Sequence, residues 1–283
     1  MNIVLVYSAA GNDAVPGSLT WFRNLYEPLV ELGHKVFQIR IDILADGWNL
    51  DKTSKGFRQR FSEYLVGEIK RIKEKHTIDL CFCYLMDSNI YPSAIQEIQE
   101  TGILITNFSC NNIHQFSLIS QISPYFDFNL YAERDAKEKF SEVDTGHIWF
   151  PMAANPKYYQ RKIVEFKRDV GFVGSAYAKR AEYLSNLLNN NLNVEIFGPQ
   201  WKQRYSKAAI LFKSFQMLVN ASADRRAAYA SELSDYFYRR NLVERFNQSF
   251  KGSVTDEAML RIYSSSRIIL GFLEVYLNHN SSS

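Results

Sequence analysis

The chain has 283 residues, enough for two domains of ordinary size, and its 46% hydrophobic and 22% charged residues are typical of a globular protein with a sizeable core. No apolar run reaches the roughly 18–20 residues that cross a bilayer, and the first residues lack the basic segment of a signal peptide. These features argue against a membrane-spanning or secreted protein. The net charge of +3 is unevenly spread, because residues 202–251 contain ten Lys or Arg and four Asp or Glu, a local charge of +6.

The three cysteines and five histidines give no sign of a metal site. Cys81 and Cys83 alternate with apolar residues in a strand-like run, and a C-x-C pair is not the spacing of a zinc knuckle. Three cysteines cannot all pair, and the histidines are scattered along the chain. We therefore predict reduced structural thiols, no bound metal and a cytoplasmic location.

Apolar patterns in the first half alternate between those of strands and those of helices. Residues 3–8 form a continuous apolar run, and residues 18–33 carry apolar side chains at the spacing of a helix that ends at Gly33. Residues 34–41 are typical of a strand, and the apolar positions from 57 to 72 predict a second helix. Further strands are predicted at 79–85, 103–108, 126–132 and 147–153, with helices between most of them. This alternation indicates parallel βαβ units in a doubly wound sheet.

A second series of such units begins after residues 151–156, where two prolines interrupt the pattern. Strands are predicted at 169–175, 194–198 and 267–273, and helices at 177–191 and 256–266, the latter capped by Thr255 with Asp256 and Glu257 in its first turn. We therefore predict an α/β protein of two Rossmann-like, doubly wound parallel-sheet domains, residues 1–155 and 168–283. The second domain is short and carries a basic helical excursion at 202–250.

Polar and glycine residues follow the first predicted strand, at the edge where open α/β sheets bind ligands. They are Gly11, Asn12, Ser18 and Thr20. Their loop lacks the G-x-G-x-x-G pattern of dinucleotide binding, and Asp42 is an ambiguous candidate for the acidic residue expected after the second strand. The loop is therefore either an ordinary turn or a polar surface on the acceptor side of a substrate cleft.

The corresponding loop of the second half is better suited to an anion. Gly174 and Ser175 end a strand, and Arg180 falls in the first turns of the helix that follows. Backbone amides, a helix start and a nearby guanidinium together suit a diphosphate. A Gly-Ser turn with a purely structural role fits the same residues.

Two side chains of the first half are candidates for a catalytic base. His114 follows the strand at 103–108 and Asp87 follows the strand at 79–85, so both are expected at the carboxyl edge of the sheet. A group that titrates near neutral pH suits deprotonation of an acceptor hydroxyl. A polar loop residue without a catalytic role is the alternative for each.

Several motifs occur in an order that is found in a known family. They are DVGFVGS with Arg180 shortly after it, VEIFGPQW, and KGSVTDEAMLRIYSSSRIILGFL; DFNLYAE, WFPMAANP, GSLTW and ELGHKV precede them. This order resembles the CgeB-like glycosyltransferases, a family of the GT-B superfamily. The resemblance covers nearly the whole chain and rests on the order and spacing of the motifs.

The resemblance implies that a sugar is transferred from a nucleotide-sugar, held by the second domain, to an acceptor held mostly by the first. Gly174, Ser175 and Arg180 would lie by the donor phosphates, Gly198 beside the nucleotide, and Tyr263 on a helix flanking the same pocket. Enzymes of this kind generally need no metal or other cofactor, because positive side chains and helix starts stabilise the leaving diphosphate.

Two features depart from the family pattern. Family members continue beyond LGFL into a segment whose acidic residue grips the donor ribose, whereas this sequence runs GFLEVYLNHNSSS, where Glu274 is a poor replacement. The stretch 202–250 is also longer than usual. A non-catalytic binding or scaffolding module that has lost part of the donor site is therefore the alternative to an enzyme.

The basic stretch 202–250 has three interpretations. Three interpretations fit its features: a helical excursion with a solvated basic face, a peripheral contact with an anionic membrane or a lipid-linked acceptor, or self-association. These features are the apolar run AAILFKSFQMLV and the five arginines of the later part, Arg225, Arg226, Arg239, Arg240 and Arg245. No motif of RNA or DNA binding accompanies it, so no nucleic acid is expected. The expected partners are a nucleotide-sugar and an acceptor that is a glycan, a lipid-linked sugar or a protein.

Overall fold

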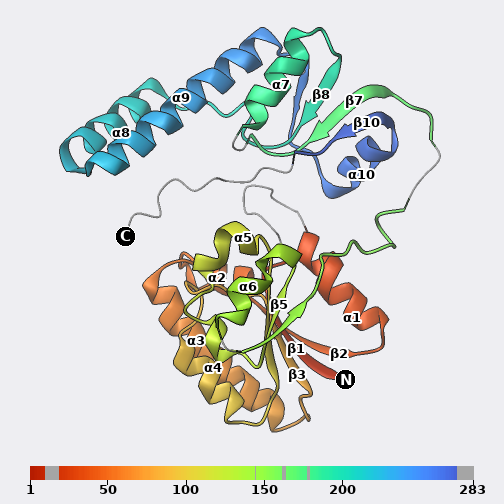
Figure 1. Cartoon of the computed structure of the whole chain (residues 1–283), viewed down its shortest axis with the longest axis vertical. Helices are drawn as coiled ribbons and strands as arrows, with labels where there is room; N and C mark the ends of the chain where they lie inside the picture. The colour runs from red at the N-terminus through yellow and green to blue at the C-terminus, as the bar shows by residue number, and fades with distance from the viewer. Residues whose placement is uncertain (10–18, 144, 161–163, 177–178, 273–283) are drawn as a thin grey trace. The chain divides into compact units, whose positions relative to one another are not determined.

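The computed structural model describes residues 1–9, 19–143, 145–160, 164–176 and 179–272. These residues form two compact units, of which the first ends at Tyr159 and the second begins at Gln160. Each unit contains one parallel sheet with helices on it (Figure 1).

Six parallel strands form the sheet of the first unit, in the order β2-β1-β3-β4-β5-β6. They are β1 Asn2–Tyr7, β2 Lys35–Arg40, β3 Leu80–Cys83, β4 Ile105–Ser109, β5 Phe128–Tyr131 and β6 Gly146–Trp149. The chain order reverses between β1 and β3, so the topological switch point of this sheet lies between those strands. All six strands were predicted from the apolar runs.

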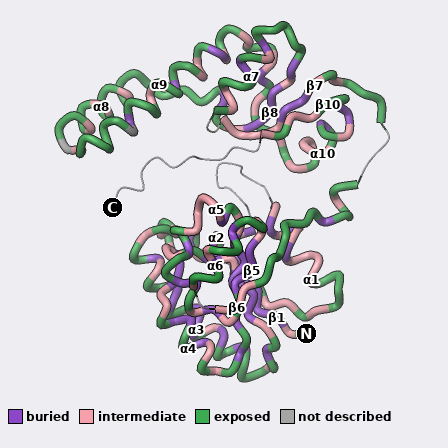
Figure 2. Tube along the Cα trace, viewed as in Figure 1, coloured by how far each residue is buried: buried purple, intermediate pink, exposed green. Residues whose placement is uncertain are grey.

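The continuous apolar run of β1 reflects a strand that is buried on both faces. Val4 and Val6 belong to the core on one face of the sheet, and Ile3, Leu5 and Tyr7 belong to the core on the other. All five side chains are buried (Figure 2). Because parallel sheets are covered by helices on both faces, such a strand must be apolar at every position.

The π- and α-helices of the first unit are η1 Phe22–Tyr26, α1 Glu27–Glu31, α2 Ile41–Trp48, α3 Lys55–Lys73, α4 Pro92–Gln99, α5 Asn112–Gln115 and α6 Lys137–Ser141. Three short 3-10 helices accompany them: η2 Phe116–Leu118, η3 Ser123–Tyr125 and η4 Arg134–Ala136. The α3 helix is capped by Ser54, whose hydroxyl accepts a hydrogen bond from the amide of Phe57 at 3.1 Å, and its predicted apolar stripe is buried. The helix predicted at 18–33 differs in two ways. Its first turns are π-helical, and Leu32 is 73% exposed because the helix ends before it.

The segment that ends the first unit packs back on its first helices. The buried Asn155 donates from its amide to Asn24 Oδ1 at 2.7 Å and from Nδ2 to the carbonyl of Arg23 at 2.9 Å. The Tyr158 hydroxyl donates to Glu27 Oε1 at 2.8 Å. These bonds attach the end of the first unit's chain to its beginning.

Four parallel strands form the sheet of the second unit, in the order β10-β7-β8-β9. They are β7 Arg168–Val173, β8 Val194–Phe197, β9 Phe250–Gly252 and β10 Ser266–Leu270. Counted along the chain from β7, this order is 3-2-1-4, the order of the first four strands of the Rossmann fold, and its switch point lies between β7 and β10. The predicted fold of two Rossmann-like parallel-sheet domains, the second one short, is therefore confirmed.

The helices of the second unit are α7 Arg180–Asn189, α8 Lys207–Asn220, α9 Ala223–Arg245 and α10 Asp256–Ser264. The hydroxyl of Thr255 accepts a hydrogen bond from the amide of Ala258 at 3.3 Å, which confirms the predicted cap of α10. The α8 and α9 helices form a hairpin between β8 and β9, where the helical excursion was predicted (Figure 1). None of the helices in the described ranges is long and apolar enough to span a membrane.

Candidate functional site

The turns that follow β7 and β8 are hydrogen-bonded to each other at the carboxyl edge of the second sheet. The amide of Gly174 donates to the carbonyl of Phe197 at 2.8 Å, and the amide of Ala176 donates to the carbonyl of Pro199 at 3.3 Å. The indole Nε1 of the buried Trp201 donates to the carbonyl of Gly174 at 2.8 Å. The β7 turn is thus fixed by three bonds to the last residue of β8 and the segment after it.

Close packing of these turns explains two of the predicted glycines. Gly198 has a φ of +140°, and a Cβ built there would lie 2.1 Å from the carbonyl oxygen of Gly174. A Cβ on Gly174 would lie 2.7 Å from Cζ of Phe172. Gly198 therefore requires glycine for packing within the protein, independently of any ligand, whereas a side chain at Gly174 would displace the ring of Phe172.

Arg180 is the first residue of α7, and its guanidinium turns back over the β7 turn. Its Nη1 lies 3.3 Å from the carbonyl oxygen and 3.5 Å from Oγ of Ser175. Its guanidinium carbon lies 5.9 Å from the centroid of the Phe172 ring. The structure therefore brings Gly174, Ser175 and Arg180 together at one end of β7, as the sequence predicted.

The backbone amides of the turn are less available than the sequence suggested. Those of Gly174 and Ala176 donate to carbonyls of the β8 turn, so neither points to a ligand. The side chains at the turn whose chemistry suits an anion are the Ser175 hydroxyl and the Arg180 guanidinium. A guanidinium forms charge-assisted hydrogen bonds with an anion, and these are stronger than the hydrogen bonds of a neutral hydroxyl.

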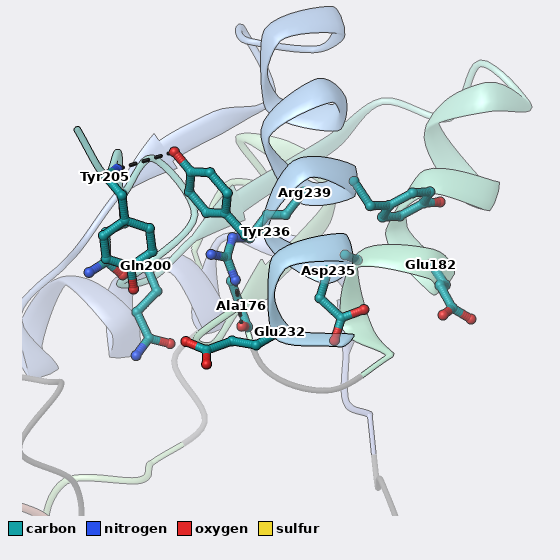
Figure 3. Close-up of a pocket in the computed structure, with 11 residues that line it drawn as sticks. Ala176, Glu182, Gln200, Tyr205, Glu232, Asp235, Tyr236 and Arg239 are labelled. Carbon is teal, nitrogen blue, oxygen red and sulfur yellow. Dashed lines mark hydrogen bonds between the residues drawn. The ribbon is translucent and has the colours of Figure 1, made fainter. Parts of the chain in front are cut away.

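A pocket of about 200 Å³ lies beside this turn (Figure 3). Its lining comes from the β7 turn, the start of α7, the segment after β8 and α9, and includes Ala176, Glu182, Gln200, Tyr205, Tyr236 and Arg239. Arg239 Nη1 donates to the carbonyl of Ala176 at 3.5 Å, and the amide of Tyr205 donates to the Tyr236 hydroxyl at 3.1 Å. The second helix of the excursion therefore contributes a wall to this pocket.

The charges of the pocket suit a neutral ligand better than a diphosphate. Glu182, Glu232 and Asp235 supply three carboxylates, against one guanidinium from Arg239. Carboxylates and the amide oxygen of Gln200 can accept hydrogen bonds from sugar hydroxyls, whereas the carboxylates repel phosphate oxygens. The pocket and the Arg180 turn therefore differ in the chemistry they favour, although they are adjacent.

The structure does not bring Tyr263 to this edge of the sheet. Tyr263 lies in the last turn of α10, shortly before β10 begins at Ser266, which pairs with Arg168 at the start of β7. Gly174 follows the other end of β7, a six-residue strand that spans about 20 Å. Tyr263 is 37% exposed near the amino edge, away from the turn that holds Arg180.

Asp87 follows β3, as expected, but its carboxylate binds the backbone. Oδ1 accepts from the amide of Ile122 at 3.1 Å, and Oδ2 accepts from the amide of Gln121 at 3.2 Å. Burial raises the pKa of Asp87 above its usual value, while these two bonds and the charge of Arg58 act against the rise. The contacts of Asp87 thus secure the segment that contains Gln121 and Ile122.

His114 lies in α5, at the carboxyl edge of β4, as its position in the sequence predicted. The helix is anchored by Asn112 Nδ2, which donates to Ser109 Oγ at 2.7 Å, and by the amide of Ile113, which donates to Glu133 Oε2 at 2.7 Å. His114 itself is half-buried, and its imidazole forms no hydrogen bond with another described residue. Of the two predicted bases, His114 is therefore the one whose side chain makes no hydrogen bond that stabilises a described segment, whereas the carboxylate of Asp87 binds two backbone amides.

Of the acceptor-side loop, Gly11, Asn12 and Ser18 lie outside the described residues. Thr20 is half-buried, and its carbonyl accepts a hydrogen bond from Asn24 Nδ2 at 2.8 Å. No role in acceptor binding follows from this contact.

Asp42 lies beside the end of β1. Arg40 Nε donates to its Oδ1 at 3.2 Å, and the amide of Ala9 donates to the same oxygen at 3.3 Å. Burial raises the pKa of Asp42, but the bonds and the positive charge of Arg40 and the amide of Ala9 outweigh it, so the pKa lies below its usual value. Asp42 is therefore engaged within the protein rather than placed for a ribose.

Reasoning from the sequence missed Trp201 and the part that α9 plays in the site. Trp201 ends the motif VEIFGPQW, and the G-x-x-W spacing after a strand was its one local signal. Tyr236 and Arg239 were predicted only as parts of a basic surface. Within the described residues, no group of three or more His, Cys, Asp or Glu could hold a metal ion, and all three cysteines are free thiols.

The comparisons with known proteins show a similarity of fold only. No family model and no curated protein matches the chain. Among solved structures, it is similar to AviGT4, a glycosyltransferase involved in avilamycin A biosynthesis, with 15% identity and a TM-score of 0.45 over 95% of this chain and 68% of that chain. A complex of S. aureus MnaA with UDP has 8% identity and a TM-score of 0.45 over 95% and 73% of the two chains. The Glycosylation Associate Protein (Gap123) complex from Streptococcus agalactiae has 13% identity and a TM-score of 0.38 over 75% and 42%. TM-scores below 0.5 are too low to assign a function, and the CgeB-like resemblance stays a prediction from the sequence.

Proposed function

We propose that the chain is a GT-B glycosyltransferase that binds the diphosphate of a nucleotide-sugar at Ser175 and Arg180. One observation carries the proposal: the guanidinium of Arg180 lies over the turn that follows β7, at the switch point of a sheet with Rossmann strand order. Nucleotides bind at this place in such sheets, and a guanidinium suits phosphate oxygens. The motif order that resembles CgeB-like glycosyltransferases supports the same reading.

The chemistry we propose uses charge rather than a metal. The positive charge of Arg180 stabilises the negative charge that develops on the diphosphate as its bond to the anomeric carbon of the sugar breaks and the acceptor oxygen bonds to that carbon. The adjacent pocket, lined by Glu182, Gln200 and Asp235, accepts hydrogen bonds from hydroxyls of the donor. His114 serves as the base that takes the proton from the acceptor hydroxyl. The acceptor is a glycan, a lipid-linked sugar or a protein.

A non-catalytic binding module is the second candidate. The amides of Gly174 and Ala176 bind the β8 turn, and the carboxylate of Asp87 binds backbone amides, so fewer groups remain for catalysis than the sequence suggested. A protein of this kind would bind a sugar in the acidic pocket without transferring it.

Thermal unfolding with a panel of UDP-, GDP- and CDP-sugars distinguishes the two. A nucleotide-sugar present at 100 times its dissociation constant adds roughly 2.7 kcal/mol to the free energy of unfolding, which is a measurable rise in Tm. We expect one class of nucleotide-sugar to raise the Tm, and the free sugar alone to have no such effect. Stabilisation by free sugars but by no nucleotide-sugar would favour the binding module.

A further inference from the structure

The α8 helix has an apolar face that no described part of the chain covers. Five large side chains on it are more than 60% exposed: Leu211 at 70%, Phe212 at 65%, Phe215 at 66%, Leu218 at 68% and Val219 at 62%. Isolated exposed apolar residues are normal, but five on one 14-residue helix are not. A cluster of this kind marks a surface that binds something.

The opposite face of α8 packs on α9. The Tyr229 hydroxyl lies 3.2 Å from Ser214 Oγ and donates to the carbonyl of Ile210 at 3.3 Å. Lys213 Nζ lies 3.3 Å from a carboxylate oxygen of Glu232. With 100° between successive residues, the five exposed side chains fall in a sector roughly 120° wide, on the side of α8 away from these contacts.

The surroundings of the apolar face are basic. Residues 202–226 contain six Lys or Arg and one acidic residue, Asp224, which gives a net charge of +5. Five of the six are exposed beside the apolar run, which they precede or follow: Lys202, Arg204, Lys207, Arg225 and Arg226. The sixth, Lys213, pairs with Glu232 on the opposite face. The partner of this surface is therefore apolar where it meets α8 and negatively charged around it.

We propose that α8 binds an anionic lipid bilayer, with its apolar face among the acyl chains next to the headgroups and its basic flanks at the headgroups. An amphipathic helix with Phe and Leu on one face and Lys and Arg beside it is suited to lying in this interface. The helix does not cross the bilayer, because 14 residues span only about 21 Å against roughly 30 Å of hydrocarbon. A second copy of the chain fits less well, since it would bring two basic surfaces together.

Arg239 and Arg240 are not part of this surface, although the sequence suggested them. Arg239 lines the pocket beside the β7 turn and donates to the carbonyl of Ala176, and Arg240 forms an ion pair with Glu244 at 2.9 Å. Of the arginines on α9, the surface therefore contains Arg225 and Arg226, in the first turn of the helix next to the end of α8.

Sedimentation of the whole chain with vesicles tests the proposal. We expect vesicles of phosphatidylcholine with phosphatidylglycerol to bind the protein at least about tenfold more strongly than vesicles of phosphatidylcholine alone, and about 0.5 M NaCl to remove most of the difference. The double substitution Phe212→Ser and Phe215→Ser should lower binding about tenfold or more. The pair Arg225→Glu and Arg226→Glu should reduce binding to the level seen with neutral vesicles.

A matched control replaces two exposed apolar residues of the same unit that lie outside α8, Leu192→Ser and Phe237→Ser, which are 46% and 49% exposed. This variant should bind within about twofold of the unchanged chain, and circular dichroism should show that all variants are folded. Equal binding to neutral and anionic vesicles, no binding to either, or unchanged binding of the Phe212/Phe215 variant would overturn the proposal. A dimer in ultracentrifugation that the Phe212/Phe215 variant abolishes, without vesicle binding, would show that a second copy covers the face.

Discussion

At the residue scale, the position of Gly198 is restricted in two ways: its φ is positive, and there is no space for a side chain. Its φ is +140°, and a Cβ would lie 2.1 Å from the carbonyl oxygen of Gly174. We expect Gly198→Ala to lower the free energy of unfolding by about 2–4 kcal/mol, because the two turns must separate and the backbone is strained. Urea unfolding measures the change.

Gly252 provides the matched control for this prediction. Its φ is also positive, +91°, but a Cβ there would have no atom within 4 Å. Gly252→Ala should therefore cost only about 1 kcal/mol, the cost of the backbone conformation itself. If the two variants lose the same free energy of unfolding, the close contact between the two turns does not add to the cost of Gly198→Ala.

Asp42 and Arg40 give the free energy of unfolding a defined dependence on pH. The pKa of Asp42 is lower in the folded protein than in the unfolded chain. The stabilisation is therefore fully present above the unfolded pKa of about 3.9 and is lost as the pH falls through the folded value. We expect Asp42→Asn to cost about 1–2 kcal/mol at pH 7 and much less at an acidic pH below the folded pKa of Asp42.

The control for this substitution is Asp46→Asn, an exposed position on the same helix, which should change stability by less than about 0.5 kcal/mol at either pH. A gap between wild type and Asp42→Asn that stays constant down to the lowest pH would show that the Arg40 pair does not act in this way.

At the element scale, the segment around Asn155 closes the first unit on its own first helices. Asn155 is 4% exposed, and its side chain donates to the carbonyl of Arg23 and accepts from the amide of Lys157 at 3.0 Å. We expect Asn155→Ala to cost about 1–3 kcal/mol, because the carbonyl of Arg23 loses its donor and the amide of Lys157 loses its acceptor. Lys157→Ala, two residues on, removes a surface ion pair to Glu31 and an exposed contact with the Tyr158 ring, and should cost less than about 1 kcal/mol. Similar losses in both would argue that the segment is held by its backbone alone.

The elements that the sequence predicted are those with long apolar patterns. The run of β1 and the stripe of α3 are buried as expected, because burial on a sheet imposes the pattern directly. The sequence did not predict α2 or β9. Two aspartates and a glycine interrupt the pattern of α2, and β9 has only three residues, whose place depends on pairing with β8.

The candidate site was predictable only in part, for reasons of tertiary structure. The position of Gly174, Ser175 and Arg180 after a strand was visible locally, whereas the bond from Trp201 joins residues 27 apart in the chain. The distance of Tyr263 from the turn follows from connectivity, because a helix that precedes a parallel strand ends at the amino edge of the sheet. The acidic pocket needs α9 to fold back, which no local pattern indicates.

At the scale of the whole molecule, the two sheets differ in what they offer a substrate. The sheet of the second unit has a basic turn and an acidic pocket side by side at its carboxyl edge. At the carboxyl edge of the first sheet, the carboxylate of Asp87 accepts hydrogen bonds from two backbone amides, and the imidazole of His114 is half-buried. We infer from this difference that the diphosphate belongs to the second unit.

Titration calorimetry of Arg180→Ala against the nucleotide-sugar that most raises the Tm of the unchanged chain tests this claim most directly. We expect the affinity to fall about 10- to 150-fold, as for the loss of a charge-assisted bond to phosphate. Arg267→Ala is the matched control: Arg267 is an arginine of the same unit at the start of β10, 67% exposed and at the amino edge of the sheet, so its loss should leave the affinity within about twofold. Unchanged affinity in a folded Arg180→Ala protein, or an equal loss in both variants, would contradict donor binding at the β7 turn.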